Sequence, residues 1–185
     1  PLAAKNDDPR DEADETLIID IDCNANSNCV EFTTQQRTIN IIDNTALPTV
    51  TLSTGVTSIN EKTGTTSTFV KATLSAVSQK VITVTLTTSG TATSTAVAPA
   101  LADYTLSSTT ITIPIDTASV SVTLTAVNDD PLDEGNELVV IDMDCNATCT
   151  ESGTQQKTVT IVDETDLPTV LLSVGSASIN ETTGT

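Results

Sequence analysis

Acidic side chains form two dense groups in this sequence, and no other residues are better suited to chemistry. Each group precedes an apolar run, and the two lie 122 positions apart. The chain has 25 acidic residues, seven basic residues and no histidine, so its net charge is −18. Crowded carboxylates repel one another unless a cation neutralises them, so the pattern indicates cation binding. The groups are Asp7, Asp8, Asp11, Glu12, Asp14 and Glu15, and then Asp129, Asp130, Asp133, Glu134 and Glu137.

The chemistry of these ligands favours calcium. Most of the acids stand at the ends of expected strands, where several turns could gather them at one pole of a domain. Calcium accepts six to eight oxygen ligands in flexible geometry, whereas magnesium demands a tighter octahedron. Transition metals prefer imidazole or thiolate ligands, and the chain has no histidine. Asp11, Asp14 and Asp133 fit equally well as solvated turn residues, since aspartate is common in turns.

The sequence repeats with a period near 120 residues. Asn6–Pro9 returns as Asn128–Pro131, and Leu47–Val50 returns as Leu167–Val170. This period is too long for a solenoid unit but suits a self-contained domain. We expect residues 1–46 to be the C-terminal half of a repeat, residues 47–166 a complete repeat, and residues 167–185 the N-terminal strand region of the next. The chain is then out of phase with its domains, and a longer chain or neighbouring subunits would complete the halves.

The complete repeat has the alternating, β-branched pattern of short strands. Seven such strands, separated by frequent turn signals, predict an all-β chain of tandem seven-stranded antiparallel β-sandwiches of the immunoglobulin-like type. Residues 89–102, which are mostly small, are expected to form a loop. The expected strands are Pro48–Leu52 continued by Thr57–Asn60, Thr68–Leu74, Val81–Thr88, Thr109–Ile113, Ser119–Val127, Glu137–Met143 and Thr154–Val162.

Four cysteines fall in two close pairs at equivalent places in the two copies. Cys23 and Cys29 are six positions apart, and Cys145 and Cys149 are four apart. Each pair stands between an apolar strand and a threonine-rich strand, where a local disulfide would clip a hairpin tip. A zinc site needs four ligands, and neither histidine nor a further local cysteine is available. We therefore expect two disulfides and an extracellular or cell-surface location.

Composition disfavours several classes of function. Without histidine, a Ser-His-Asp or Cys-His catalytic system cannot form. A glycosidase cleft built on paired carboxylates usually has aromatic walls, and this chain has three aromatic residues. The acidic balance disfavours nucleic acid and anionic lipid as partners. We expect no enzyme, no nucleic-acid partner and no membrane insertion.

The order of motifs in the complete repeat resembles the Calx-beta domain family, which occurs in sodium–calcium exchangers and in many tandem bacterial surface proteins. The matching motifs are Pro48-Thr49-Val50, Ser58–Glu61, Ala102–Tyr104, Val127–Asp130 and Val159–Asp163. The resemblance implies a seven-stranded sandwich that binds calcium at its distal loops. The implied calcium ligands are Glu61, Asp103, Asp129, Asp130, Glu134, Glu137 and Asp163.

The partial copies would contain incomplete ligand sets. Calcium-sensing members of the family have three consecutive aspartates after the last strand, where this chain has Asp163–Asp166 in one copy and Asp43–Ala46 in the other. Fewer ions are therefore expected in the first copy. Its implied ligands are Asp7, Asp8, Glu12, Glu15 and Asp43, and the third copy would contribute Glu181.

Together these features predict a structural or adhesive segment of a long secreted or cell-surface protein. We expect an adhesin stalk or extracellular filament in which calcium stiffens the poles where repeats meet. The linker Asn44–Leu47 is too short for a flexible tether. The expected partners are neighbouring repeats, further subunits of a filament, and a cell-surface or matrix ligand. The alternatives are an intracellular calcium-sensing module and a ligand- or carbohydrate-binding adhesion module.

Overall fold

The predicted all-β fold is confirmed by the computed structural model, which describes residues 1–5, 11–23, 28–33, 35–94, 102–128, 135–164, 167, 169–178 and 181. Within these residues there is no helix long and apolar enough to cross a membrane. The strands are β1 (Glu15–Asp20), β2 (Gln36–Ile41), β3 (Thr49–Thr54), β4 (Ser58–Asn60), β5 (Ser67–Leu74), β6 (Ile82–Gly90), β7 (Tyr104–Leu106), β8 (Thr110–Ile113), β9 (Ser119–Ala126), β10 (Glu137–Cys145), β11 (Thr150–Glu151) and β12 (Gln156–Val162).

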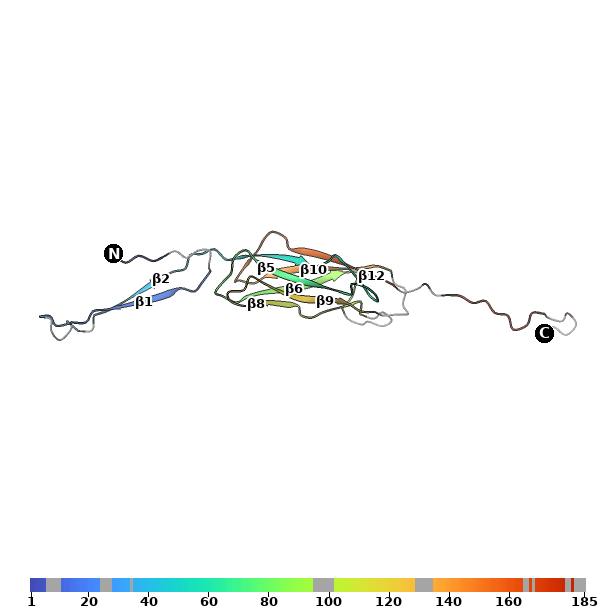
Figure 1. The fold of residues 1–185 in the computed structure, drawn as a ribbon, viewed down its shortest axis with the longest axis horizontal. Coiled ribbons are helices and arrows are strands. Elements are labelled where there is room, and N and C mark those ends of the chain that lie inside the picture. Colours follow the sequence, from blue (N-terminus) through green and yellow to red (C-terminus); the bar gives the residue numbers. More distant parts are fainter. Residues whose placement is uncertain are drawn as a thin grey trace.

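Strands β3 to β12 form a sandwich of two sheets (Figure 1). One sheet has the order β4-β12-β10-β6-β8 and the other β11-β3-β5-β9-β7. Neighbouring strands are antiparallel except for two edge pairs, β12–β4 and β11–β3, which are parallel. Strands β3 and β4 are the two halves of the predicted broken first strand, and they lie in opposite sheets. The chain therefore crosses between the sheets at this break, which ties the two layers together.

The core between the sheets is mainly aliphatic, with Tyr104 as a buried aromatic side chain. Strand β5 illustrates the alternation: Val70 and Ala72 are buried, whereas the neighbouring Phe69 is exposed. Because successive side chains of a strand point to opposite faces, each strand places every second residue in the core. The largest fully buried side chains are Ile59, Ile82, Ile111, Ile113, Leu124, Ile141, Ile161, Val50, Val70, Val84, Val139 and Val159.

Two short strands, β7 and β11, were not predicted. Strand β7 pairs with β9 and β11 pairs with β3, so both lie at sheet edges. With three and two residues, neither is long enough to show an alternating pattern. The predicted loop at residues 89–102 begins later than expected, because β6 continues to Gly90. Residues 95–101 of that loop lie outside the described residues.

The segments on either side of the sandwich expose faces that the sandwich buries. Strands β1 and β2 form a hairpin with the same register as β10 and β12. Ile19 in the hairpin is 41% exposed, whereas its counterpart Ile141 is 0% exposed. Likewise Val170 is 95% exposed and its counterpart Val50 is 0% exposed. The hairpin and the C-terminal segment extend from opposite ends of the sandwich (Figure 1). The boundaries predicted near residues 46 and 166 remain predictions.

Both predicted disulfides form. Cys23 pairs with Cys29, with their Cα atoms 5.8 Å apart, and Cys145 pairs with Cys149 at 5.6 Å. The second disulfide closes the turn from β10 to β11, which belong to opposite sheets, and Cys149 is buried in the core. Asn146 shapes the same turn by accepting a hydrogen bond from the Thr148 amide at 3.0 Å. This disulfide therefore stabilises a second point at which the chain crosses from one sheet to the other.

Removing the Cys145–Cys149 disulfide is expected to destabilise the sandwich. Closing a ring this small is worth about 2 kcal/mol in the loop-entropy model. The double variant C145S/C149S should lose about that much free energy of unfolding in urea denaturation. The matched variant C23S/C29S alters only the exposed hairpin and should leave the main transition unchanged. Equal effects of the two double variants would contradict the assignment of Cys149 to the core.

Candidate functional site

Three of the implied calcium ligands lie at one end of the sandwich, which we call the distal pole. Glu61 follows β4, Asp163 follows β12 and Glu137 begins β10. Glu137 lies opposite Ile161 in the β10–β12 pair. The amide of Glu61 donates to the carbonyl oxygen of Val162 at 3.3 Å. Because β4, β12 and β10 are adjacent strands, the three residues belong to neighbouring chain segments at the same pole.

Asp103 is the fourth implied ligand within the described residues, and it is buried. One carboxylate oxygen accepts a hydrogen bond from the Thr93 amide, and the Asp103 amide donates back to the Thr93 carbonyl at 2.9 Å. Its own carbonyl oxygen accepts from the Val127 amide at 2.8 Å. The Ala92 amide meanwhile donates to the Leu138 carbonyl at 3.1 Å. This chain of contacts links Asp103 to the start of β10, next to Glu137.

The end of β6 reaches this position because of Gly90. Its φ is +118°, and a Cβ built there would lie 2.1 Å from the carbonyl oxygen of Leu138. Any larger residue would have to move one strand of the β6–β10 pair. Gly90 thus allows residues 91–93 to run close to β10 and to meet Asp103.

The turn before β10 is fastened to the end of β12 by two hydrogen bonds in opposite directions. The Gly135 amide donates to Oδ2 of Asp163 at 3.1 Å. The Asp163 amide donates to Oδ1 of Asn136 at 3.3 Å. These bonds hold the acidic turn against the last strand of the repeat.

The first copy repeats this arrangement around Asp43, the counterpart of Asp163. The Glu12 amide donates to Oδ2 of Asp43 at 2.9 Å, and the Asp43 amide donates to Oδ1 of Asp14 at 3.0 Å. Oδ1 of Asp43 also accepts from the Thr45 amide at 2.8 Å. Hydrogen bonds from the amide and then the hydroxyl of Thr45, and after them from the Glu12 amide, lower the pKa of Asp43 from its ordinary value of 3.8, with a smaller contribution from the charge of Lys80.

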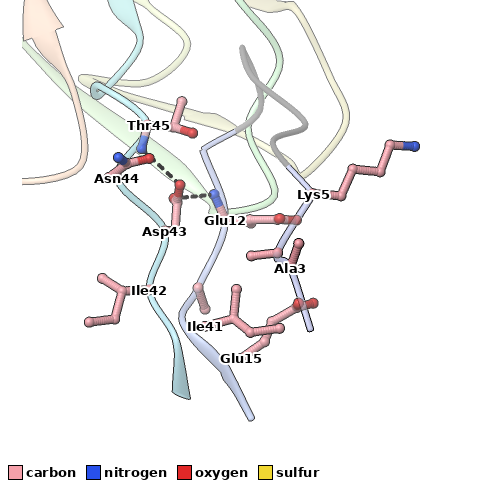
Figure 2. A pocket seen from close by; sticks show the side chains of 11 residues that line it. Ala3, Lys5, Glu12, Glu15, Ile41, Ile42, Asp43, Asn44 and Thr45 are labelled. Atoms are coloured by element: carbon pink, nitrogen blue, oxygen red, sulfur yellow. Dashed lines mark hydrogen bonds between the residues drawn. The ribbon is translucent and has the colours of Figure 1, made fainter. Parts of the chain in front are cut away.

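Three of the implied ligands of the first copy line a groove of about 540 Å³. Figure 2 shows Glu12 and Glu15 on one segment and Asp43 on another, with the Asp43 carboxylate turned toward the Glu12 and Thr45 amides. Lys5 lies on the same groove. The groove is thus lined by carboxylates from two segments that are about 30 residues apart, together with one cationic side chain.

Glu164 follows Asp163 and binds the turn after β4 at the distal pole. Its carboxylate accepts from the Lys62 amide at 3.0 Å and from the amide and hydroxyl of Thr63, both at 2.6 Å. The hydrogen bonds from Thr63, and after them that from Lys62, lower the pKa of Glu164 from its ordinary value of 4.5. The carboxylate is therefore a structural acceptor that fixes the turn after β4.

The described residues do not by themselves form a metal site. Among them, no three His, Cys, Asp or Glu side chains come close enough to hold a metal ion. The donor chemistry nevertheless suits calcium, since the poles offer oxygen ligands, and Oε2 of Glu137 is buried at the distal pole. Glu181 lies in the C-terminal segment that follows β12. The remaining implied ligands, Asp7, Asp8, Asp129, Asp130 and Glu134, lie outside the described residues.

Sequence reasoning missed a second polar cluster, at the end of the sandwich that faces the hairpin. From the sequence, Asp11 fitted equally well as a solvated turn residue. In the structure it is only 2% exposed. It forms an ion pair of 2.7 Å with Lys80 and lies next to Ser78. The signal that could have revealed it is the placement of Lys80, one of only seven basic residues, in a turn between two strands.

Comparison with solved structures finds similar folds at low sequence identity. The apo form of the Calx CBD1 domain matches with 14% identity and a TM-score of 0.47, over 64% of this chain and 99% of that chain. The calcium binding domain CBD12 of CALX1.1 matches with 17% identity and a TM-score of 0.45, over 57% of this chain and 40% of that chain. A two-domain protein of unknown function from Bacteroides fragilis matches with 11% identity and a TM-score of 0.47, over 64% of this chain and 46% of that chain. This chain thus spans nearly all of the first structure and less than half of the other two.

The other comparisons give no family. No protein-family model matches the sequence, and no curated protein matches it. The shared feature is therefore the β-sandwich fold.

Substituting Gly90 by alanine is expected to disrupt the distal pole. The positive φ and the clash with the Leu138 carbonyl should together cost more than about 2 kcal/mol. Urea denaturation of Gly90→Ala should show this loss. The control Gly175→Ala introduces a methyl group into open space and should not change the transition. A fully stable Gly90→Ala variant would show that β6 does not pass this close to β10.

The carboxyl group of Glu164 is expected to titrate below 4.5 in the folded protein. Because the folded-state pKa is lowered, its hydrogen bonds stabilise the turn at neutral pH, and this stabilisation is lost as pH falls through the folded-state pKa. Thr63→Ala removes the hydroxyl donor and should shift the midpoint upward, as measured by NMR of the carboxyl carbon. Thr112→Ala, on the exposed face of β8, should leave it unchanged. An identical Glu164 midpoint in all three proteins would refute this prediction.

Proposed function

We propose that this chain is a non-catalytic β-sandwich segment of an extracellular repeat array that binds calcium at its acidic poles. One observation carries the proposal: in both copies an amide of the turn before the apolar strand donates to the aspartate that follows the last strand, from Glu12 to Asp43 and, one position further along, from Gly135 to Asp163. The amide of that aspartate donates to the side chain at an equivalent position, Asp14 in one copy and Asn136 in the other. Repetition of this geometry in two copies means that each repeat presents its carboxylates at the same pole. A binding site built into the repeat would therefore recur along the array.

In the complete repeat, Glu61, Glu137 and Asp163 would hold the ion together with Asp129, Asp130 and Glu134. Asp103 accepts a hydrogen bond from the Thr93 amide and would be a further ligand of the same ion. In the first copy, Glu12, Glu15 and Asp43 would act with Asp7 and Asp8. Bound calcium supplies positive charge that neutralises these carboxylates. The chain's own residues orient the oxygens through backbone hydrogen bonds before any ion arrives.

The extracellular assignment is supported by the two disulfides. Disulfides persist in oxidising compartments and are rare in the cytosol. Calcium outside cells is in the millimolar range, where sites of about 10⁻⁴ M affinity are adequate. The intracellular sensor alternative needs tighter sites and reduced thiols, so the disulfides weigh against it.

A structural role agrees with the composition of the chain, which lacks the residue most often used in acid–base catalysis. It has no histidine to act as a general base, and carboxylates such as Asp43 and Glu164 accept hydrogen bonds from backbone amides. Neighbouring repeats are therefore the first partners of each sandwich. Adhesion to a cell-surface or matrix ligand would be a property of the whole array.

Calcium titration of the full chain tests the proposal. We expect binding near 10⁻⁴ M by calorimetry, and at about 1 mM calcium a stabilisation of about 1.4 kcal/mol per site. Glu137→Gln should weaken binding severalfold, because it removes a charged ligand at the distal pole. The matched control Glu151→Gln, in the edge strand β11, should bind like the parent. Absence of calcium-dependent heat and stabilisation would overturn the proposal.

A further inference from the structure

We propose that the turn Ser78–Lys80 is a docking surface for the acidic turn of the preceding repeat, and that an aspartate–lysine ion pair joins consecutive repeats without a divalent ion. The inference rests on the repeat array proposed above but not on calcium binding. Its partner is specific: the segment around Asp11, which belongs to the copy before the complete sandwich. We call this contact the joint.

The joint combines side-chain and backbone contacts between residues almost 70 positions apart. Lys80 Nζ lies 2.7 Å from Asp11 Oδ1, and the Asp11 side chain is 3% exposed. The Gln79 amide donates to the Asp11 carbonyl at 2.9 Å, within an isolated parallel bridge between Asp11 and Ser78. The Ser78 hydroxyl contributes contacts of 3.3 and 3.4 Å to the Asp11 carbonyl and Oδ2. A solvated turn residue would not have this set of partners.

The receiving turn is held in place by its own repeat. The Lys80 amide donates to the Ser78 hydroxyl at 2.9 Å, which shapes the turn. The Asp116 amide donates to the Ser78 carbonyl at 2.9 Å, which ties it to the turn between β8 and β9. With the Asp11 segment in place, Ser78 is 1% exposed. The two hydrogen bonds from Lys80 and Asp116 come from the sandwich itself, so its own residues shape the receiving turn.

The incoming turn is equally well fixed by the preceding copy. Asp43 binds the Glu12 amide, and its own amide binds Asp14, so the residues that follow Asp11 are attached to the end of β2. Docking Asp11 on Lys80 thus couples two ordered units. Preorganised partners lose little conformational entropy on contact, which strengthens the coupling.

Electrostatics give Lys80 a specific role at this joint. Its pKa is raised, first by the hydrogen bond to Asp11, which outweighs the opposing effect of burial, and to a lesser extent by the charges of Asp11, Asp43 and Asp14. One ammonium group thus offsets part of the negative charge where two acidic segments converge. Because the carboxylate that it binds is buried, the pair is less screened by salt than a surface pair would be.

The aspartate that corresponds to Asp11 is also present in the second copy. Asp133 occupies the position of Asp11 in the second copy, 122 residues later, with the same Asp-Glu sequence. Asp133 lies outside the described residues. In both copies, therefore, the sequence has an aspartate at the position that would contact the following repeat.

The test measures amide exchange of Gln79 in the full chain by NMR, in a buffer containing a calcium chelator. Exchange of Gln79 reports on the joint because this amide binds the Asp11 carbonyl. We expect protection in the parent and about tenfold faster exchange in Lys80→Met, which corresponds to a charge-assisted hydrogen bond. The control Lys157→Met, on the exposed side of β12, should exchange like the parent. The amides of Val139 and Ile141 should remain protected in every variant, which shows that the sandwich is folded.

A charge reversal separates a specific pair from general destabilisation. Asp11→Lys and Lys80→Asp should each expose the Gln79 amide, and the double variant should regain at least part of the protection. Unchanged exchange in Lys80→Met, or no recovery in the double variant, overturns the ion pair as the coupling element. Loss of Gln79 protection in the chelated parent would show that a divalent ion holds the joint instead. Failure of calcium binding in the titration above leaves this result unaffected, so the two proposals fail separately.

Discussion

A reciprocal pair of hydrogen bonds between the acidic turn and the end of the last strand determines the form of both poles. In one copy it joins Asp163 to Gly135 and Asn136, and in the other it joins Asp43 to Glu12 and Asp14. The bonds act where β12 or β2 ends, so the position of the turn follows from strand pairing in the sandwich. In the described part of the first copy, Glu12 and Asp14 are thereby brought next to the end of β2.

Hydrogen bonds of this kind explain how a chain with a net charge of −18 can place carboxylates close to one another. Hydrogen bonds from the hydroxyl and amide of Thr63 lower the pKa of Glu164, and hydrogen bonds from Thr45 and the Glu12 amide lower the pKa of Asp43, so these carboxylates remain charged at neutral pH. Lys80 offsets another carboxylate by direct pairing. The described carboxylates at the poles therefore combine hydrogen-bond partners with negative charge.

The sequence predicted what local periodicity can encode. Alternation of apolar residues predicted the sandwich and most of its strands, and the positions of the cysteines predicted both disulfides. It did not predict β7 and β11, which are too short for a period, nor the parallel pairs, which depend on where the chain crosses between sheets. The burial of Asp11 was also missed. Its partner Lys80 is 69 positions away, and no local pattern distinguishes a docked aspartate from a solvated one.

The two ends of the complete sandwich are chemically different, and this asymmetry explains how successive repeats could join in series. One end presents Lys80 in a preformed turn, and the other carries the acidic turn that precedes β10. A contact between unlike surfaces of identical units does not close on itself unless rotation brings it back, so it generates an extended array. Calcium at the acidic poles would then add rigidity to a direction already set by the joint. On this view the ion pair determines which surfaces meet, and the divalent ion determines how firmly they are held.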